Sequence, residues 1–244
     1  MDSLLMTDGT SNTSGVSPID FLRTRSLTNV VQTEIERMIV EGEFTPNERI
    51  NENALAQRLK VSRGPIREAC SALVALGLIQ VIPNRGFFVR ELSEEEAREV
   101  SEARAYLFAC IVMGAAKNAG EKDIAKLRSL VDRMDELTAT GEVSSYYPVN
   151  LDFHTELAKC CGNMRLAQIY LGLARELHIQ RYRALASGDV LTVSNAEHRA
   201  IVDAVAAHDA QRGFAAGYAH ITNGTARTRR ATSARHHHPA TSFD

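Results

Sequence analysis

The chain of 244 residues is long enough for two domains, and its 44% hydrophobic and 24% charged residues are ordinary for a globular protein. No apolar run approaches the roughly 20 residues that span a bilayer, and the start lacks the basic region and apolar core of a secretory signal. We therefore expect a cytoplasmic protein with no membrane contact. Its four cysteines show no Cys-x-x-Cys spacing and are expected to be small buried hydrophobes in a reducing compartment.

The first predicted element is an amphipathic helix from Leu27 to Val40, where apolar residues recur at helical spacing. Gly42 is expected to end this helix. The preceding residues 1–19 are rich in Ser, Thr, Gly and Asp, a composition typical of disorder, so we expect a disordered N-terminal arm.

Two short helices with a tight joint are predicted next. The first covers Glu52 to Lys60, and the second covers Arg63 to Leu76, with apolar residues three or four apart. Ser62 is a suitable N-cap for the second helix, and Pro65 is tolerated because it lies in the first helical turn. Gly77 follows as a stop signal.

A β-hairpin is predicted after these helices. Ile79–Ile82 and Phe87–Arg90 are apolar runs, and the segment between them, which ends at Gly86, contains Pro and Asn and suits a turn. Helix, turn, helix and a two-stranded wing together predict a winged helix-turn-helix domain over residues 20–92.

This domain is a basic island on an acidic chain. Residues 49–90 hold seven Lys or Arg and two acids, whereas the whole chain has a net charge of −2. Such an island indicates a surface for backbone phosphates. Arg63 and Arg67 lie four apart at the start of the second helix, where an arginine can pair with guanine in the major groove. The alternative is an ordinary solvated arginine face.

A known pattern runs through the whole motif. The matching residues are Leu55, Ala56, Leu59, Val61, Ser62, Arg63, Pro65, Arg67, Glu68, Ala69, Leu73, Gly77, Leu78, Arg85, Gly86 and Val89. With these residues the segment resembles the DNA-binding domain of GntR-type transcriptional regulators. The resemblance implies that Ser62, Arg63 and Arg67 contact operator DNA, and that the wing with Arg85 and Gly86 enters the minor groove. Some members carry an arginine that touches DNA where this chain has Asn53.

After the wing, the pattern is helical throughout. Ser93 and Glu96 form a capping box that opens a helix to about Asn118, and Ser194 with Glu197 suggests a second box. The further predicted helices are Glu121–Ala139, Ser144–Cys161, Met164–Ala186, Ser194–Ala207 and Ala210–Arg227. Six helices with short joints predict an all-α bundle over residues 93–228. The polar residues 229–244 are expected to form a disordered tail. The predicted fold class is therefore mainly α.

Four side chains in this half have metal-ligand chemistry. Asn150 and His154 lie four apart on one helix face, and His198 lies on the apolar face of its helix. His220 shares its face with Gly213, Gly217 and Gly224, small residues expected to leave room for a ligand or ion. Three histidines on three helices can converge on a divalent transition metal. The alternative is that they are separate core or surface histidines.

Arg104, Phe153-His154, Glu197-His198 and His220 carry a second resemblance. With them, residues 94–225 resemble the FCD effector domain of the fatty-acid-regulator-like branch of the GntR regulators. The resemblance implies a divalent metal ion, zinc or nickel-like, held by Asn150, His154, His198 and His220 beside an effector pocket.

Arg104 is a candidate carboxylate clamp in that pocket, with an inter-helix salt bridge as the alternative role. Two positions depart from the family. Asn150 stands where many members have Asp, so the metal charge is less compensated, which weakens metal binding and favours an anion. Phe108 stands where many members have Glu. Metal occupancy is expected to fall below about pH 6, because the histidines must be neutral to coordinate.

These patterns predict a homodimeric, ligand-responsive regulator of transcription, a repressor that binds double-stranded operator DNA and is not an enzyme. Its effector is expected to be a small anionic, carboxylate-type molecule. One alternative is a metal-dependent hydrolase on a helical bundle, but Asp152 and Glu156 lie at the wrong angles to serve as its general base. Another is an architectural DNA-binding protein, which would not need a helical domain with buried polar residues.

Overall fold

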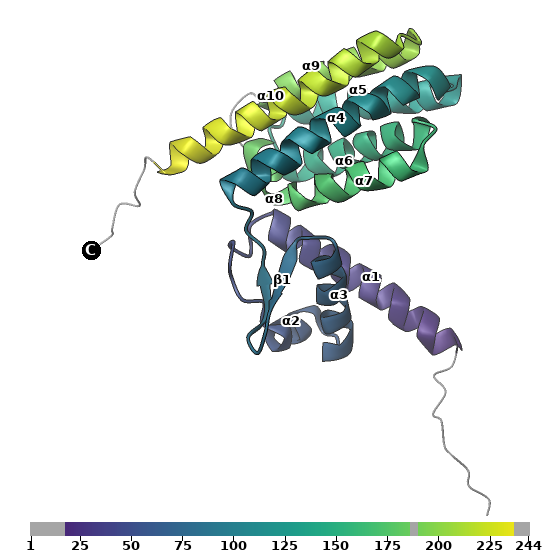
Figure 1. Ribbon diagram of the computed structural model, residues 1–244. Coiled ribbons are helices and arrows are strands. Elements are labelled where there is room, and N and C mark those ends of the chain that lie inside the picture. The colour runs from purple at the N-terminus through teal and green to yellow at the C-terminus, as the bar shows by residue number, and fades with distance from the viewer. Residues whose placement is uncertain (1–17, 186–189, 237–244) are drawn as a thin grey trace, which may run out of the picture.

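The computed structural model describes residues 18–185 and 190–236, which form a small N-terminal domain and a larger helical domain (Figure 1). The predicted fold class, mainly α with a winged helix-turn-helix before a helical bundle, is confirmed. The predicted disordered arm lies outside the described residues except for its last two, since the first helix begins at Pro18. None of the helices that the structure describes is long and apolar enough to cross a membrane.

The N-terminal domain has three helices and a two-stranded sheet. These are α1 (Pro18–Val40), α2 (Glu52–Leu59), α3 (Arg63–Ala75), β1 (Ile79–Ile82) and β2 (Gly86–Val89). The core forms because α1 and α3 place Ile35, Ile39, Ile66 and Leu73 at helical spacing on facing sides, and all four are fully buried. β1 and β2 pair antiparallel, with Ile79 opposite Val89 and Ile82 opposite Gly86.

Local backbone chemistry sets the ends of these elements. Asn51 caps α2, since its side-chain oxygen accepts the N–H groups of Asn53 and Ala54 at 3.1 Å. Ser62 stands at the N-cap position of α3, as predicted, but its hydroxyl makes no capping bond. Gly77 ends α3 with φ +76°, a conformation that favours glycine.

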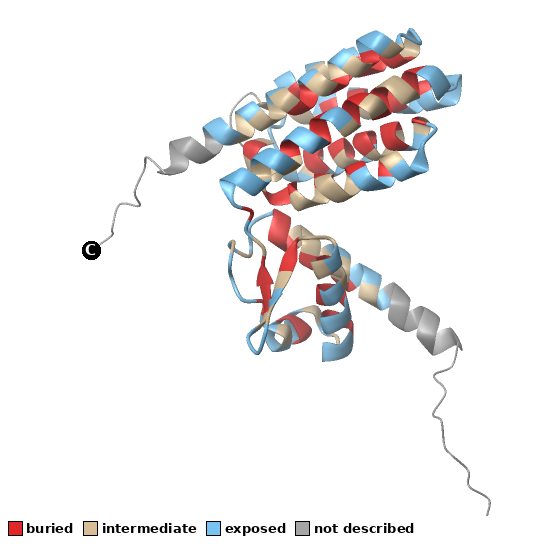
Figure 2. Ribbon diagram, viewed as in Figure 1, coloured by how far each residue is buried: buried red, intermediate tan, exposed pale blue. Residues whose placement is uncertain are grey.

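The second domain contains seven helices among the described residues, one more than predicted. They are α4 (Glu94–Asn118), α5 (Glu121–Thr138), α6 (Val143–Cys160), α7 (Met164–Glu176), α8 (His178–Leu185), α9 (Val190–Ala206) and α10 (Ala210–His236). The capping box at Ser93 is confirmed, because its hydroxyl accepts the N–H of Glu96 and its own N–H donates to the Glu96 carboxylate. Buried residues line the inward faces of these helices (Figure 2).

α4 and α10 run antiparallel side by side (Figure 1). A Cβ atom at Gly213 or Gly217 would lie 3.3 or 2.9 Å from the Val112 side chain. These two glycines therefore permit close helix packing rather than leaving room for a ligand, contrary to the prediction. Only Gly224, of the three predicted, lines a pocket.

The predicted start of the first helix at Leu27 was wrong, because α1 begins nine residues earlier at Pro18. Three predicted helix boundaries in the second domain were also wrong. The predicted helix Met164–Ala186 is interrupted at Leu177, whose backbone leaves the helical region (φ −98°, ψ 9°) and so separates α7 from α8. α9 begins at Val190 because the extra turn buries Leu191, so Ser194 lies inside the helix and caps nothing. α10 continues to His236, beyond the predicted tail boundary at residue 229, because its alanines and arginines favour helix.

The two domains meet at the end of α7 and the start of α8, above the C-terminal end of α1 (Figure 1). Ile179 of α8 is buried within the apolar core of the N-terminal domain. Glu176 accepts a hydrogen bond from Arg90 (3.2 Å), and His178 Nδ1 lies 3.4 Å from Glu36 Oε1. The helical domain therefore contributes a side chain to the core of its neighbour.

Candidate nucleic-acid interface and metal centre

The start of α3 presents a basic surface. Arg63 and Arg67 are exposed, whereas Pro65 and Ile66 between them are buried and anchor the helix. No hydrogen bond or ion pair to another described residue restrains either guanidinium group. Ser62 is also exposed, and its hydroxyl has no capping bond. These three side chains are therefore available to an external partner.

The wing adds a second basic feature. Arg85 is exposed at the hairpin turn, and its guanidinium carbon lies 5.1 Å from the centre of the Phe88 ring. Gly86 has φ +96°, and Asn84 has φ +60°, so the turn uses residues that accept such angles. Asn53 is exposed in the first turn of α2. The predicted DNA-contact positions thus all occur on exposed turns or at helix starts, apart from the half-buried Gly86.

Not all seven basic residues of the island are free to bind an external anion. Arg58 forms an ion pair with Glu43, and Arg90 pairs with Glu96 and Glu176. Within the described parts of the chain, the five remaining cations form no ion pair; they are Arg49, Lys60, Arg63, Arg67 and Arg85. The charge available for a polyanion is therefore concentrated on α3 and the wing.

In the helical domain, His154, His198 and His220 converge, as predicted. They come from α6, α9 and α10, and at most 6% of each is exposed. One ring nitrogen from each lies within 4.8 Å of the others, close enough for a single ion after a small side-chain shift. Phe108 of α4 closes one side, with its ring centre 4.8 Å from that of His154 and 5.9 Å from that of His220.

The hydrogen bonds of the three rings leave their inner nitrogens free. His154 Nδ1 lies 2.9 Å from the Tyr170 hydroxyl, and His198 Nδ1 lies 3.3 Å from Asn195 Oδ1. His220 Nδ1 lies 2.9 Å from a Glu197 oxygen. The Nε2 atoms of His154 and His198 are buried without a partner. A metal ion fits this arrangement, because metal-bound histidines typically use their second nitrogen to bond an orienting group.

The orienting groups are themselves held in place. Asn195 donates to the carbonyl of Val131 (3.0 Å), which turns its oxygen toward His198. Glu197 accepts two hydrogen bonds of 2.8 Å from Arg227. Burial alone would raise the pKa of Glu197, but the hydrogen bonds from Arg227 and His220 lower it to about 2. Glu197 is therefore a carboxylate and orients the His220 ring.

The histidines themselves are neutral at physiological pH. Burial holds the pKa of His154 and of His198 well below the usual value. Burial also lowers the pKa of His220, although Glu197 acts in the opposite direction. Neutral imidazoles have the lone pairs that metal coordination requires.

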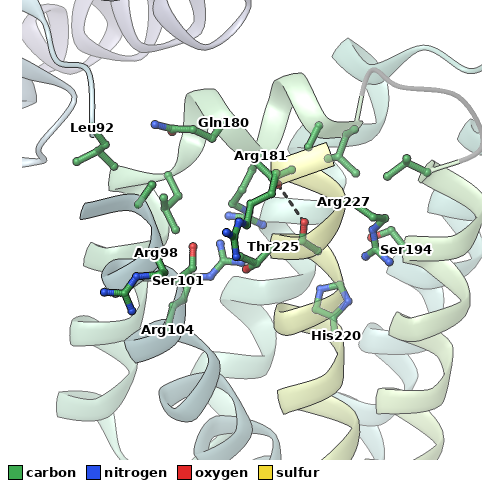
Figure 3. A pocket seen from close by; sticks show the side chains of 18 of the residues that line it. Leu92, Arg98, Ser101, Arg104, Gln180, Arg181, Ser194, His220, Thr225 and Arg227 are labelled. Atoms are coloured by element: carbon green, nitrogen blue, oxygen red, sulfur yellow. Dashed lines mark hydrogen bonds between the residues drawn. The ribbon is translucent and has the colours of Figure 1, made fainter. Parts of the chain in front are cut away.

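A cavity of about 490 Å³ adjoins this cluster, in the size range of small-molecule sites. Ser101 and Arg104 extend into it from α4, Arg181 from α8 and His220 from α10 (Figure 3). Asn150 is buried, lies one helical turn before His154 and lines the same cavity. Arg104 is 4% exposed, and its Nε and Nη1 atoms have no hydrogen-bond partner. The alternative of an inter-helix salt bridge at Arg104 finds no acidic partner in the described residues.

Sequence analysis missed several members of this site. Arg181, on α8, was not singled out, and Glu197 was assigned to a capping box. Asn195 and Tyr170 were also missed as histidine partners. The spacing of Asn195 and His198, three apart on one helix face, was a usable signal. The other contacts join separate helices, and no local spacing indicates them.

A winged helix-turn-helix whose arginines form no ion pair in the described residues, joined to a helical domain, is the architecture of DNA-binding regulators. Residues 27–89 match the family described as bacterial regulatory proteins, gntR family, and residues 99–223 match the FCD domain. The chain belongs to the gntR family of bacterial regulatory proteins and carries an FCD domain.

Similar proteins agree with this assignment. The chain is 35% identical over 147 residues to the Nta operon transcriptional regulator of Aminobacter aminovorans, an alignment of 59% of this chain and 69% of that protein. It is 30% identical over 182 residues to the HTH-type transcriptional repressor GlaR of Escherichia coli, covering 71% and 83% of the two chains. The E. coli McbR/YncC structure has the same fold, with a TM-score of 0.75 at 20% identity over 84% of this chain and 98% of that one.

The protein is therefore a transcriptional regulator and not an enzyme, as predicted. The alternative of a metal-dependent hydrolase is set aside, because these relatives are regulators and the helix-turn-helix half matches the same family.

Proposed function

We propose that this regulator is a homodimeric repressor whose binding to operator DNA changes when a small anionic effector occupies the cavity of the helical domain. The DNA-binding domain covers about residues 20–92, and the effector and dimerisation domain covers about residues 93–228. One observation carries the proposal. Helix α8 lines the cavity with Gln180 and Arg181, while its neighbouring residue Ile179 is buried in the core of the DNA-binding domain.

On the DNA side, Arg63 and Arg67 contact base edges in the major groove, and Ser62 contacts the backbone near the start of α3. Support comes from their exposure and from the absence of competing ion pairs in the described residues. Arg85 and Gly86 bring the wing to the minor groove. Asn53, at the start of α2, takes the place of an arginine that touches DNA in some relatives and contributes a neutral contact at most.

In the helical domain, His154, His198 and His220 would hold one divalent ion, zinc or nickel-like, with Asn150 as a weak fourth ligand. The free, buried Nε2 atoms of His154 and His198 support this assignment. The ion would supply positive charge and an open coordination position for an anionic ligand. Arg104 then binds a carboxylate of that ligand, since its planar group suits bidentate pairing.

The effector controls DNA binding through the junction between the domains. A ligand that contacts Arg181 favours one position of α8, and α8 carries Ile179 in the core of the DNA-binding domain. In a two-fold dimer, a shift of each DNA-binding domain changes the separation of the two α3 helices, and operator half-sites tolerate little change in spacing.

We propose repression rather than activation because several relatives are named as repressors. They are GlaR of E. coli, NanR of Enterobacter and a probable D-xylose utilization operon repressor of Paenarthrobacter nicotinovorans. A repressor acts on chromosomal DNA, so its place is the cytoplasm.

The test uses the full-length protein. Denaturation followed by mass spectrometry and elemental analysis identifies the molecule and the metal that the purified protein carries. Operator affinity is then measured by fluorescence anisotropy with and without that molecule. We expect a change of roughly fivefold or more, the usual scale of allosteric coupling. An operator affinity that stays the same at saturating ligand would exclude effector control.

A further inference from the structure

Two arginines face the cavity without an acidic partner. Arg104 on α4 and Arg181 on α8 each have a buried Nη1 atom with no hydrogen-bond partner, and Arg104 Nε is also unpartnered. Neither guanidinium group forms an ion pair within residues 18–185 and 190–236. The guanidinium carbon of Arg181 lies 5.8 Å from the centre of the Tyr147 ring. Figure 3 shows both arginines directed into the cavity from different helices.

Of the three other arginines that line the cavity, Arg229 is exposed and two form ion pairs. Arg227 is held by Glu197, and Arg98 lies half exposed near Glu95, Glu99 and Glu102. Arg104 and Arg181 therefore supply the buried positive charge that no acidic side chain compensates. Burial and the neighbouring charge of Arg181 lower the pKa of Arg104 to about 10, so Arg104 remains charged at neutral pH. A buried charge without a partner is costly, and an anion in the cavity would offset that cost.

The two arginines lie on other helices than the histidines of the cluster. The three ring nitrogens of that cluster come from α6, α9 and α10, whereas the guanidinium groups come from α4 and α8. Apolar side chains of Leu177, Ala184 and Leu185 line the cavity beside them. With a metal bound, the cavity would thus offer two cationic groups, the arginine pair and the metal-loaded cluster.

We propose that Arg104 and Arg181 form an anion-binding subsite separate from the three-histidine cluster, so that the effector of this protein is a dicarboxylate. One carboxylate binds the two arginines, and the other faces the histidine cluster. This inference rests on the proposed function and names the ligand class of the same cavity. A monocarboxylate fills one end only and leaves either the arginines or the cluster without an anion.

The position of Arg181 gives the subsite a role in signalling. Arg181 lies on α8, two residues after Ile179, which is buried in the core of the DNA-binding domain. A carboxylate that bridges Arg181 to Arg104 ties α8 to α4. A ligand bound at the histidine cluster alone makes no such connection. Dicarboxylates should therefore change operator affinity more than monocarboxylates do.

Calorimetric titration of the full-length protein tests the subsite. The ligands are malonate, succinate, glutarate and adipate, with butanoate and inorganic phosphate as comparisons at constant ionic strength. The variants are Arg181→Gln and Arg104→Gln, and Arg165→Gln is the matched control because Arg165 is exposed and lies outside the cavity.

We expect wild type and Arg165→Gln to bind at least one dicarboxylate roughly tenfold or more tightly than butanoate and phosphate, the scale of one charge-assisted bidentate pair. Arg181→Gln and Arg104→Gln should lose this preference and keep their metal content and circular dichroism. Equal binding of mono- and dicarboxylates by wild type, no binding of any member of the series, or an unchanged preference in both variants would overturn the proposal.

The operator assay separates this proposal from the function on which it rests. If dicarboxylates bind through both arginines but leave operator affinity unchanged, the subsite stands and effector control fails. If operator affinity responds equally to butanoate in wild type and Arg181→Gln, effector control stands and the dicarboxylate subsite is wrong.

Discussion

Glu176, the last residue of α7, accepts a hydrogen bond of 3.2 Å from Arg90, the residue directly after the wing. The same side chain covers Gly77 at the end of α3, where a Cβ atom would lie 2.9 Å from Glu176 Cγ. Glu176 thus touches both the end of the helix that carries Arg67 and the residue that follows the wing. It connects the effector domain directly to the two DNA-contacting elements.

Glu176→Gln should weaken the coupling between domains more than it weakens the fold. The ion pair is partly exposed, so its loss should cost less than about 1 kcal/mol of unfolding free energy. The ratio of operator affinities with and without effector should move toward one. Glu99→Gln is the control, because Glu99 is exposed on α4 near Arg98. An effector response equal to that of wild type would show that this contact does not transmit the effector signal to the DNA-binding domain.

Arg67→Ala should cost about 1–3 kcal/mol of binding free energy at one base pair and relax the preference for that base. Arg85→Ala should instead weaken binding to all sequences and reduce the salt slope by about one. Both outcomes follow from exposed arginines without ion pairs in the described residues. The measurement is binding to single-base variants of the operator over a salt series, with Arg165→Ala as control. If Arg67→Ala lost the same binding free energy on all operator variants, Arg67 would not recognise a specific base.

His198→Ala should reduce the metal content of the purified protein, as measured by elemental analysis. Tyr170→Phe should weaken metal affinity by roughly tenfold or more, because it removes the group that orients His154. Asn150→Asp should tighten metal binding and weaken an anionic effector, since a carboxylate compensates the ion. Metal content that is unchanged in His198→Ala would remove the metal centre and leave the DNA-binding assignment intact.

Arg104→Met should stabilise the ligand-free protein while abolishing binding of an anionic effector. The lowered pKa of Arg104 means that folding disfavours its charged form, so the charge costs stability at neutral pH. Replacing this partnerless buried cation by an apolar side chain of similar length should raise the unfolding free energy by roughly 1–3 kcal/mol. Urea denaturation measures the change. A clear destabilisation would indicate that Arg104 has a structural partner instead.

The metal-free protein should lose stability as pH falls from 7 to 5.5. The buried histidines remain neutral in the fold because their pKa values are lowered, but in the unfolded chain they take up protons below about pH 6.5. Each histidine that stays neutral reduces the unfolding free energy by up to about 1.4 kcal/mol per pH unit over this range. We expect a total loss of at least about 1 kcal/mol.

Denaturation at matched ionic strength checks this, and a flat profile between pH 7 and 5.5 would mean that the histidines are protonated in the fold. The same lowered pKa values keep the imidazoles available to metal in more acidic solution. Metal occupancy should therefore persist below the pH of about 6 that unperturbed histidines suggest.

The sequence was informative where chemistry is local. The α3 helix, its N-cap position at Ser62 and the pairing of the wing all depend on neighbouring residues, and the predicted elements agree with the observed ones within one residue. The sequence also predicted that three histidines converge, because the family resemblance identified the helices that carry His154, His198 and His220.

Contacts between distant helices could not be predicted in the same way. The break at Leu177 has no glycine or proline to mark it, so α8 was missed and Arg181 with it. Glu197 fitted a local capping pattern, yet tertiary packing extends α9 to Val190 and directs Glu197 toward His220 and Arg227. The burial of Ile179 in the neighbouring domain likewise depends on how the two domains meet.

Sequence-specific binding by the full-length protein tests the account most directly. Selection from a random pool of duplexes should enrich a two-fold symmetric site, because a homodimer presents two α3 helices. In about 0.15 M salt the selected duplex should bind roughly a thousandfold or more tightly than a scrambled duplex of the same composition. A preference of only a few-fold, or enrichment of no symmetric sequence, would contradict the proposed role of α3 and the wing as an operator-reading surface.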